Sequence, residues 1–128
     1  MPRWDDYKAD ARARGALALE LFVVHSVPAD DGAAVRAALP DHLAYQARLE
    51  AEGALVLAGP LSDESGENVE GMGMIVYRAR SLSEARALAE DDPMHRTGAR
   101  RFTLRRWLVN EGGLSLTVRL SGQTVSLS

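Results

Sequence analysis

Three histidines and a set of carboxylates are the side chains best suited to proton transfer or metal binding in this sequence. The histidines are His25, His42 and His95, and the chain has no cysteine. Disulfides, thiolate nucleophiles, Cys-based zinc sites and iron–sulfur clusters are therefore excluded. An imidazole titrates near neutral pH, so it can accept and return a proton within one turnover. Any chemistry must come from histidine, carboxylate, hydroxyl or arginine side chains, or from a bound ion.

His42 is expected in the first turn of a helix. Pro40 is expected to separate this helix from a shorter one, Asp41 is suited to the N-cap, and Gly53 is suited to the C-terminal end because glycine tolerates the left-handed region. The residues that share one face at helical spacing are Leu39, His42, Tyr45 and Leu49. The histidine ring should therefore point toward the sheet or a cleft.

Asp92 is expected at the end of the buried stripe of the following helix. Ser81 and Glu84 have the spacing of a capping box at the start of that helix. The stripe itself consists of Ala85, Leu88, Ala89 and Asp92. Asp92 before Pro93 is also the pattern of an N-cap before a first-turn proline, and a histidine on a helix face can be a satisfied core group. A structural role therefore stands beside the functional one for both residues.

The other two histidines have less distinctive surroundings. Residues 18–27 form the first predicted strand, and its alternation puts His25 at the end of an apolar stripe with Leu21 and Val23. His95 follows Met94 and is equally suited to the surface or to a helix exit. Neither position by itself predicts catalysis.

The pattern of strands and helices predicts an α+β fold of ferredoxin-like type. The run 54–58 is a short apolar strand, of the kind that a sheet covered on its faces requires, and Gly59-Pro60 ends it. Two further strands are predicted, 71–79 and 101–109, and the first of them should pair antiparallel with 54–58. The order β-α-β-β-α-β corresponds to a four-stranded antiparallel sheet with two helices on one face. The other face needs a partner, and a second copy of the chain is the simplest one.

Three segments are expected along the chain. They are an N-terminal extension with a short helix (1–17), the α+β domain (18–110) and a C-terminal β-hairpin extension (111–128). Two strands alone are marginally stable in water, so the hairpin should extend the sheet or reach another subunit.

Composition narrows the classes of partner. With 128 residues, 46% of them hydrophobic, the chain is the size of one domain with a single core. A net charge of −3 and the lack of a basic run with interleaved aromatics disfavour nucleic acid and membrane surfaces as partners. There is no apolar stretch of transmembrane length and the N-terminus is too polar for a signal peptide, so a cytoplasmic location is expected.

Several short motifs occur in an order that resembles the YciI-like family, also called the YCII-related domain, over residues 19 to 110. The motifs are His42-Leu-Ala-Tyr, Gly53, Ala58-Gly-Pro-Leu61, Ser83-Glu-Ala-Arg-Ala-Leu-Ala-Glu-Asp-Asp-Pro93 and Gly98. The resemblance implies a ferredoxin-like fold that dimerises through the open sheet face into an α+β barrel. It also implies that His42 and Asp92 form an active-site pair. The clearest reaction in that family is removal of chloride from a chlorinated hydroxyhydroquinone.

One feature departs from the family pattern. Family members often carry an arginine shortly before the histidine, whereas this chain has Leu39, Pro40 and Asp41 there and Arg36 is the nearest arginine. An anion-binding role for an arginine at that place is therefore not supported.

The leading hypothesis is a cofactor-free acid–base site in which Asp92 orients the His42 ring and stabilises its protonated form. Such a pair could serve elimination, isomerisation or dehalogenation of a small molecule, aromatic compounds included. The residues predicted to bind the substrate are His25, Tyr45, Gly59, Pro60 and His95.

Two other hypotheses remain open. Three histidines with Asp92 would suit zinc, but no two histidines stand at a local ligand spacing, so no metal site is predicted. The chain could instead be a non-enzymatic homodimer that binds a small ligand or a protein. Apolar residues available for such a cleft, or for ordinary core packing, are Met72, Met74, Tyr45 and Trp107.

Overall fold

The structure, a computed structural model, describes residues 1–128. It contains two compact units, of which the larger is Glu20–Trp107 and the smaller is formed by the two chain ends, Met1–Leu19 and Leu108–Ser128. No helix combines the length and the apolar character that crossing a membrane requires.

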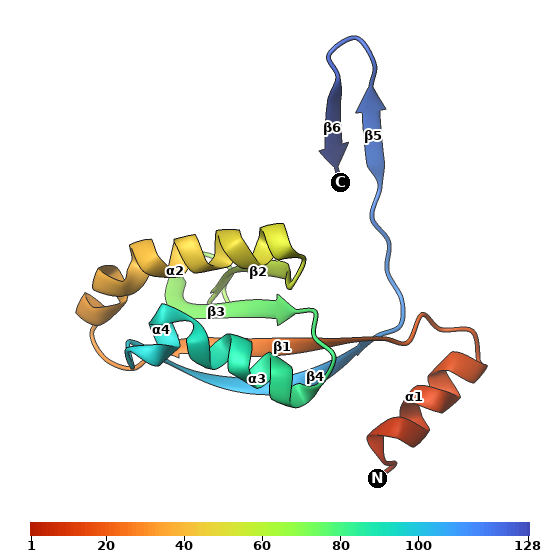
Figure 1. Cartoon of the computed structure of the whole chain (residues 1–128), viewed down its shortest axis with the longest axis horizontal. Helices are drawn as coiled ribbons and strands as arrows, with labels where there is room; N and C mark the ends of the chain where they lie inside the picture. The colour runs from red at the N-terminus through yellow and green to blue at the C-terminus, as the bar shows by residue number, and fades with distance from the viewer. The chain divides into compact units, whose positions relative to one another are not determined.

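The larger unit has the ferredoxin-like order that the sequence predicts (Figure 1). Its strands are β1 (Leu19–Pro28), β2 (Leu55–Ser62), β3 (Val69–Tyr77) and β4 (Arg100–Val109), in the sheet order β2-β3-β1-β4. Its helices are α2 (Ala33–Glu52), α3 (Leu82–Asp91) and the single turn α4 (Pro93–Arg96). β3 pairs antiparallel with both β1 and β2. The α+β fold class is therefore confirmed.

The core lies between one face of the sheet and the helices α2 and α3. Alternation along β1 turns Phe22 and Val24 to this face, where they meet Leu49 of α2. From α3, Ala85 and Ala89 are fully buried, and their small side chains let this helix lie close to the sheet. Both helices thus cover the same face, and Ser81 caps α3 by accepting a hydrogen bond from the Glu84 backbone N–H, 3.0 Å.

α2 is one continuous helix, so the predicted break at Pro40, with Asp41 as N-cap, is wrong. A proline inside a helix removes one N–H, here the donor to the carbonyl of Arg36, but the alanines and leucines on both sides favour the helix. His42 therefore lies inside α2 rather than in its first turn.

The ends of α2 are set by two glycines. The N-cap is Gly32, with φ 94°, and the carboxylate of Asp31 accepts a hydrogen bond from the N–H of Ala33 at 3.1 Å. The C-cap is Gly53, with φ 82°, as predicted. α2 is thus fixed at both ends by backbone conformations that glycine adopts without strain.

β2 continues through Gly59 and Pro60 to Ser62, so the predicted strand end at Gly59-Pro60 is wrong. β2 is an edge strand, where a proline without a donor is tolerated because no ladder bond is lost on the outer side. In the single chain Leu57 is 63% exposed, on the face that the sequence analysis expects a second copy to cover. Gly59 and Pro60 consequently lie along the edge of the sheet.

The smaller unit contains α1 (Trp4–Ala13) and the antiparallel hairpin of β5 (Leu116–Arg119) and β6 (Thr124–Leu127). Both the predicted short helix and the predicted hairpin are present. In the hairpin, Leu116 lies opposite Leu127 and Val118 opposite Val125, and all four side chains are exposed. These four residues form an apolar face on a two-stranded sheet that is marginally stable alone.

We expect the apolar hairpin face to pack on another copy of the chain. A chain truncated after Gly113 should therefore elute as a smaller oligomer on a sizing column with light-scattering detection. Val118→Ser in the full chain should have the same effect, because it makes the apolar face polar, whereas Thr117→Ser on the opposite face should not. An unchanged oligomer in the truncated chain would refute this expectation.

Candidate active site

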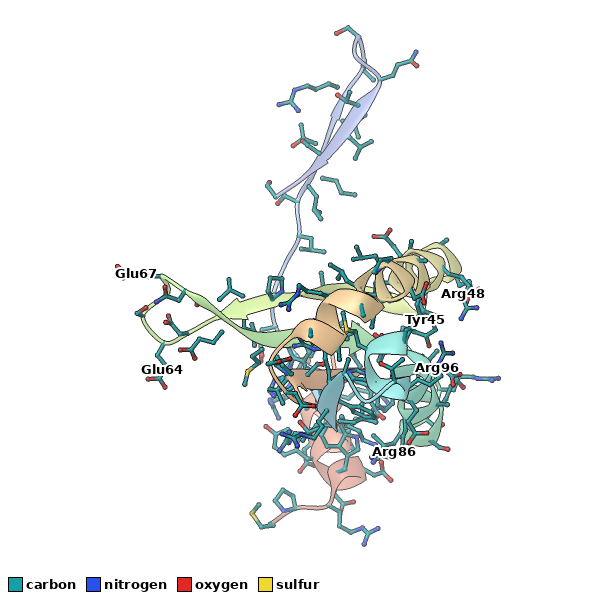
Figure 2. All side chains as sticks on the ribbon, turned by 90° about the vertical axis from the view of Figure 1, so that its left-hand side faces the viewer. Tyr45, Arg48, Glu64, Glu67, Arg86 and Arg96 are labelled. Carbon is teal, nitrogen blue, oxygen red and sulfur yellow. The ribbon has the colours of Figure 1, made fainter.

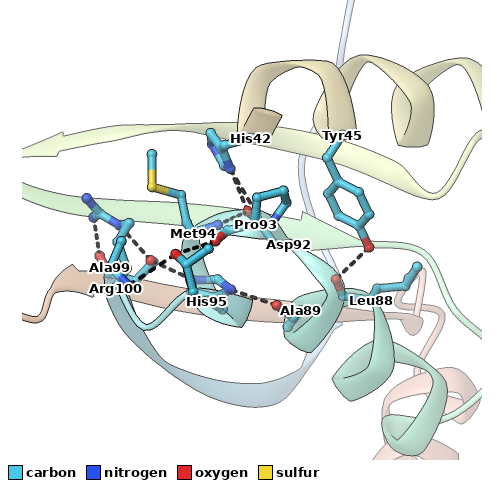
Figure 3. A network of polar contacts seen from close by, with 12 residues as sticks. His42, Tyr45, Leu88, Ala89, Asp92, Pro93, Met94, His95, Ala99 and Arg100 are labelled. Carbon is cyan, nitrogen blue, oxygen red and sulfur yellow. Dashed lines mark hydrogen bonds and ion pairs between the residues drawn. The ribbon is translucent and has the colours of Figure 1, made fainter. Parts of the chain in front are cut away.

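His42 and Asp92 are in direct contact (Figure 3). His42 Nδ1 lies 2.8 Å from Asp92 Oδ1 and 2.9 Å from Oδ2. The Asp92 side chain is fully buried and that of His42 is 15% exposed. Because an ionised carboxylate only accepts hydrogen bonds, Nδ1 carries the proton, and Nε2 of the neutral ring is then an acceptor. The contact therefore selects the tautomer in which Nε2 can take up a proton.

The carboxylate of Asp92 also caps α4. Its Oδ1 accepts a hydrogen bond from the backbone N–H of Met94 at 2.9 Å, and Pro93 occupies the first helical position, where a missing N–H is harmless. The sequence leaves open whether this aspartate is a helix cap or a partner of the histidine. In the structure it makes both contacts at once.

The His42 ring lines a cavity of about 420 Å³ between α2 and the strands β2 and β3. Most of its walls are apolar, and they include Leu39, Leu43, Pro60, Met72, Met74 and Met94. The polar side chains in the walls are Ser26, His42, Gln46 and Arg100. A small apolar cavity with a few polar groups is typical of a site for a small ligand.

Among the residues predicted to bind a substrate, Gly59 and Pro60 line this cavity together with His42. His25 does not, because it alternates with the inward-facing Val24 and Ser26 and is exposed on the other face of the sheet. In the strand register it lies opposite Met74.

Tyr45 lies on another side of α2. It lines a second cavity, of about 520 Å³, together with Arg48 and Arg96, and Figure 2 shows these three residues on one side of the domain. Its hydroxyl donates to the carbonyl of Leu88 at 2.7 Å. Burial, assisted by the negative charges of Asp91 and Asp92, raises the pKa of Tyr45 to about 12. The hydroxyl therefore remains a donor that ties α2 to α3.

His95 uses both ring nitrogens within the protein. Nδ1 donates to the carbonyl of Ala89 at 2.7 Å, so Nε2 accepts from the hydroxyl of Ser26 at 2.8 Å. The ring also packs against Phe102, with centroids 4.6 Å apart. Burial lowers the pKa of His95. His95 is therefore a neutral, structural hydrogen-bonding group in this fold, outside the cavity walls.

Ser26 and Arg100 are cavity residues that sequence reasoning does not single out. Ser26 is 3% exposed and alternates with the core residues Phe22 and Val24 along β1. Arg100 alternates with Phe102 and Leu104, which pack on the core, although its arginine neighbours give this stretch the look of a solvated basic cluster. The sequence signal that could have identified both residues is the same. Each is a polar residue at a position of its strand that alternation assigns to the buried, apolar face.

The histidines do not converge on one point. His42 lines the cavity, His25 lies on the opposite face of the sheet, and His95 is bonded at both nitrogens. No group of three or more histidine or carboxylate side chains is placed to share a metal ion.

The lowered pKa of His95 predicts a pH dependence of stability. The unfolded chain, with an ordinary histidine pKa of about 6.5, binds the proton more readily than the folded chain, so stability is fully present above that pH and falls below it. The thermal midpoint of the wild type should therefore drop between pH 7.5 and pH 5. His95→Gln should show a smaller drop, and the exposed-residue control His25→Gln should behave as the wild type. An equal drop in His95→Gln would contradict the assignment.

Comparison with known proteins places these features in a family. The YCII-related domain matches residues 21–108. The uncharacterised protein YjpA of Bacillus subtilis (strain 168) is 35% identical over 66 residues, which cover 52% of this chain and 71% of YjpA. Among solved structures, 5-chloro-2-hydroxyhydroquinone dehydrochlorinase (TftG) from Burkholderia phenoliruptrix AC1100, in complex with 2,5-dihydroxybenzoquinone, is similar with a TM-score of 0.57 and 23% identity. The match covers 68% of this chain and 92% of that structure, and at this identity it shows the fold.

Proposed function

This chain belongs to the YCII-related domain family, and from that premise we propose that it is an enzyme in which His42 and Asp92 perform cofactor-free acid–base chemistry on a small ring compound. The observation that carries the proposal is the contact of His42 Nδ1 with both oxygens of the buried Asp92 carboxylate. It leaves Nε2 as the proton acceptor of a ring that lines an apolar cavity.

Asp92 has two effects on the proposed base. It fixes the tautomer, and it provides the negative charge that stabilises the imidazolium formed when His42 takes a proton. A buried carboxylate is costly unless it is hydrogen-bonded, and here the Met94 N–H satisfies it independently of the histidine. The carboxylate therefore stays in place whether or not the ring is protonated.

Elimination of hydrogen chloride is the reaction that we favour. His42 Nε2 takes a proton from a carbon atom of the substrate, the electron pair of that C–H bond goes to form a new π bond, and chlorine leaves as chloride with the electron pair of the C–Cl bond. The proton is then released to solvent, so no oxidant or reductant is needed. The structural neighbour TftG is a dehydrochlorinase, which supports this reaction class. The apolar walls of the 420 Å³ cavity suit a single six-membered ring.

A second candidate is a homodimeric module that binds a small ligand without turnover. Met94 in the cavity wall favours it, because a flexible thioether side chain adapts to varied apolar ligands. Both candidates include a dimer through the open sheet face, where Leu57 and Trp107 are exposed.

The test of the proposed enzyme is release of chloride from 5-chloro-2-hydroxyhydroquinone. His42→Gln and Asp92→Asn should each lower kcat/KM by roughly 10²- to 10⁴-fold, the usual contribution of a general base. Asparagine caps a helix as well as aspartate does, so Asp92→Asn removes the charge while keeping the α4 cap. Asp91→Asn, at the exposed neighbouring position, is the matched control and should retain activity. Equal turnover in all four proteins would refute the role of the pair.

The tautomer of His42 is a separate prediction. Two-bond ¹H–¹⁵N NMR spectra of the wild type at pH 8 should show the His42 proton on Nδ1, because only that nitrogen faces the carboxylate. A ring protonated on Nε2 could not accept a substrate proton there and would contradict the mechanism.

A further inference from the structure

Arg100 brings a positive charge to the cavity that His42 lines. Its guanidinium is held by the backbone and side chain of the neighbouring strand: Nε donates to Ser26 Oγ and Nη2 to the Ser26 carbonyl, both at 2.8 Å. Nη2 also donates to the carbonyl of Gly71. Figure 3 shows Arg100 and His42 on opposite sides of Met94. The guanidinium is thus fixed in one orientation by β1 and β3.

All of these partners are neutral, and no carboxylate forms an ion pair with Arg100. Nη1 makes no hydrogen bond within the protein. Burial lowers the pKa of Arg100, and only the more distant Asp92 acts in the opposite direction. An arginine keeps its charge under these conditions, and a partly desolvated cation without a counter-ion is unfavourable.

The local backbone is shaped to hold this charge and leave space beside it. Gly71 has φ 102°, and a Cβ at this position would lie 2.8 Å from Cγ of Pro28, so only glycine allows the carbonyl to reach Arg100. Gly73 lines the cavity with no side chain, and the nearest side-chain atom to its Cβ position is Arg100 Nη2, at 3.8 Å. The cavity is therefore open next to the guanidinium.

Proton transfer changes the balance of charge in the site. In the resting state Asp92 is negative, Arg100 is positive and His42 is neutral. When His42 takes a proton, the imidazolium stays paired with Asp92, and the net charge of these three groups rises from zero to +1. A negative charge that develops on the substrate at the same moment would then be stabilised most strongly.

We propose that Arg100 binds the substrate oxygen on which negative charge develops, so that the substrates are small rings with a phenolate or enolate oxygen. This inference rests on the proposed function and names the substrate class of the same site. In the proton-transfer step a C–H bond of the substrate's keto tautomer breaks, the proton moves to His42 Nε2, and the electron pair moves onto the carbonyl oxygen. The resulting enolate pairs with Nη1 of Arg100. In the elimination that we favour, this electron pair then returns to re-form the carbonyl as the new π bond forms and chloride leaves.

The experiment compares binding of benzoate and benzamide, which have the same ring and nearly the same shape but differ in charge. By calorimetry or NMR titration, the wild type should bind benzoate about tenfold or more tightly than benzamide, as expected for a charge-assisted hydrogen bond. Arg100→Gln should lose this preference and Arg100→Lys should retain part of it. Arg101→Gln, at the exposed neighbouring position on the other face of β4, should bind like the wild type.

Arg100→Gln also removes ties to Ser26 and Gly71, so its fold is checked by circular dichroism and thermal melting. If it does not fold, the wild type and Arg100→Lys decide the question. A wild type that binds benzoate no more tightly than benzamide, or a folded Arg100→Gln that keeps the preference, overturns the inference.

These measurements require no turnover. A benzoate preference lost in Arg100→Gln supports anion recognition even in a chain that releases no chloride, in which case only the proposed reaction fails. Chloride release that is equal in Arg100→Gln and the wild type, together with an unchanged preference, leaves the reaction intact and overturns the role of Arg100 alone.

Discussion

The arrangement of the site depends on the burial of one carboxylate. Asp92 is fully buried, and an ionised carboxylate in such a place is stable only with hydrogen-bond donors directed at it. The donors are the Met94 N–H, supplied by the turn that starts at Pro93, and Nδ1 of His42, supplied by α2. The same carboxylate therefore starts α4, binds α2 and sets the orientation of the imidazole. Loss of the histidine would leave the cap, whereas loss of the carboxylate would remove both contacts.

A second polar network runs through His95 of α4. In this network each group donates to the next. Arg100 Nε donates to Ser26 Oγ, the Ser26 hydroxyl donates to His95 Nε2, and His95 Nδ1 donates to the carbonyl of Ala89. This direction is consistent only with a neutral His95, in agreement with its lowered pKa. The short turn α4 thus joins both sets of contacts: Asp92 caps it and bonds to His42, and His95 within it bonds to the serine that holds Arg100.

Local signals in the sequence predict the fold, but not the contacts between distant residues. Alternation, the Ser81 cap and the left-handed Gly53 identify the elements and their order, because each depends on neighbours within a few positions. Pro40 is a misleading local signal, since one lost hydrogen bond does not outweigh a helix that is favoured on both sides.

The network of Ser26, His95 and Arg100 joins positions up to 74 residues apart, and no local spacing encodes it. Its members can be identified only as polar residues in register with core residues. Their partners depend on the sheet order, in which β1 lies between β3 and β4. His25, by contrast, lies on the face away from the cavity because it alternates with Val24 and Ser26 along β1.

A residue outside the cavity makes a second contact between the segments that carry His42 and Asp92. Tyr45 donates to the carbonyl of Leu88. Tyr45 follows His42 by three residues and Leu88 precedes Asp92 by four, so the Tyr45–Leu88 and His42–Asp92 contacts lie one turn apart along antiparallel helices. A shift of either helix by one turn, about 5.4 Å, would break both contacts together. With its pKa raised to about 12, the Tyr45 hydroxyl stays protonated throughout the range in which a histidine titrates. The Tyr45 hydroxyl therefore keeps its donor proton for the Leu88 carbonyl, and with it this link between α2 and α3, throughout that range.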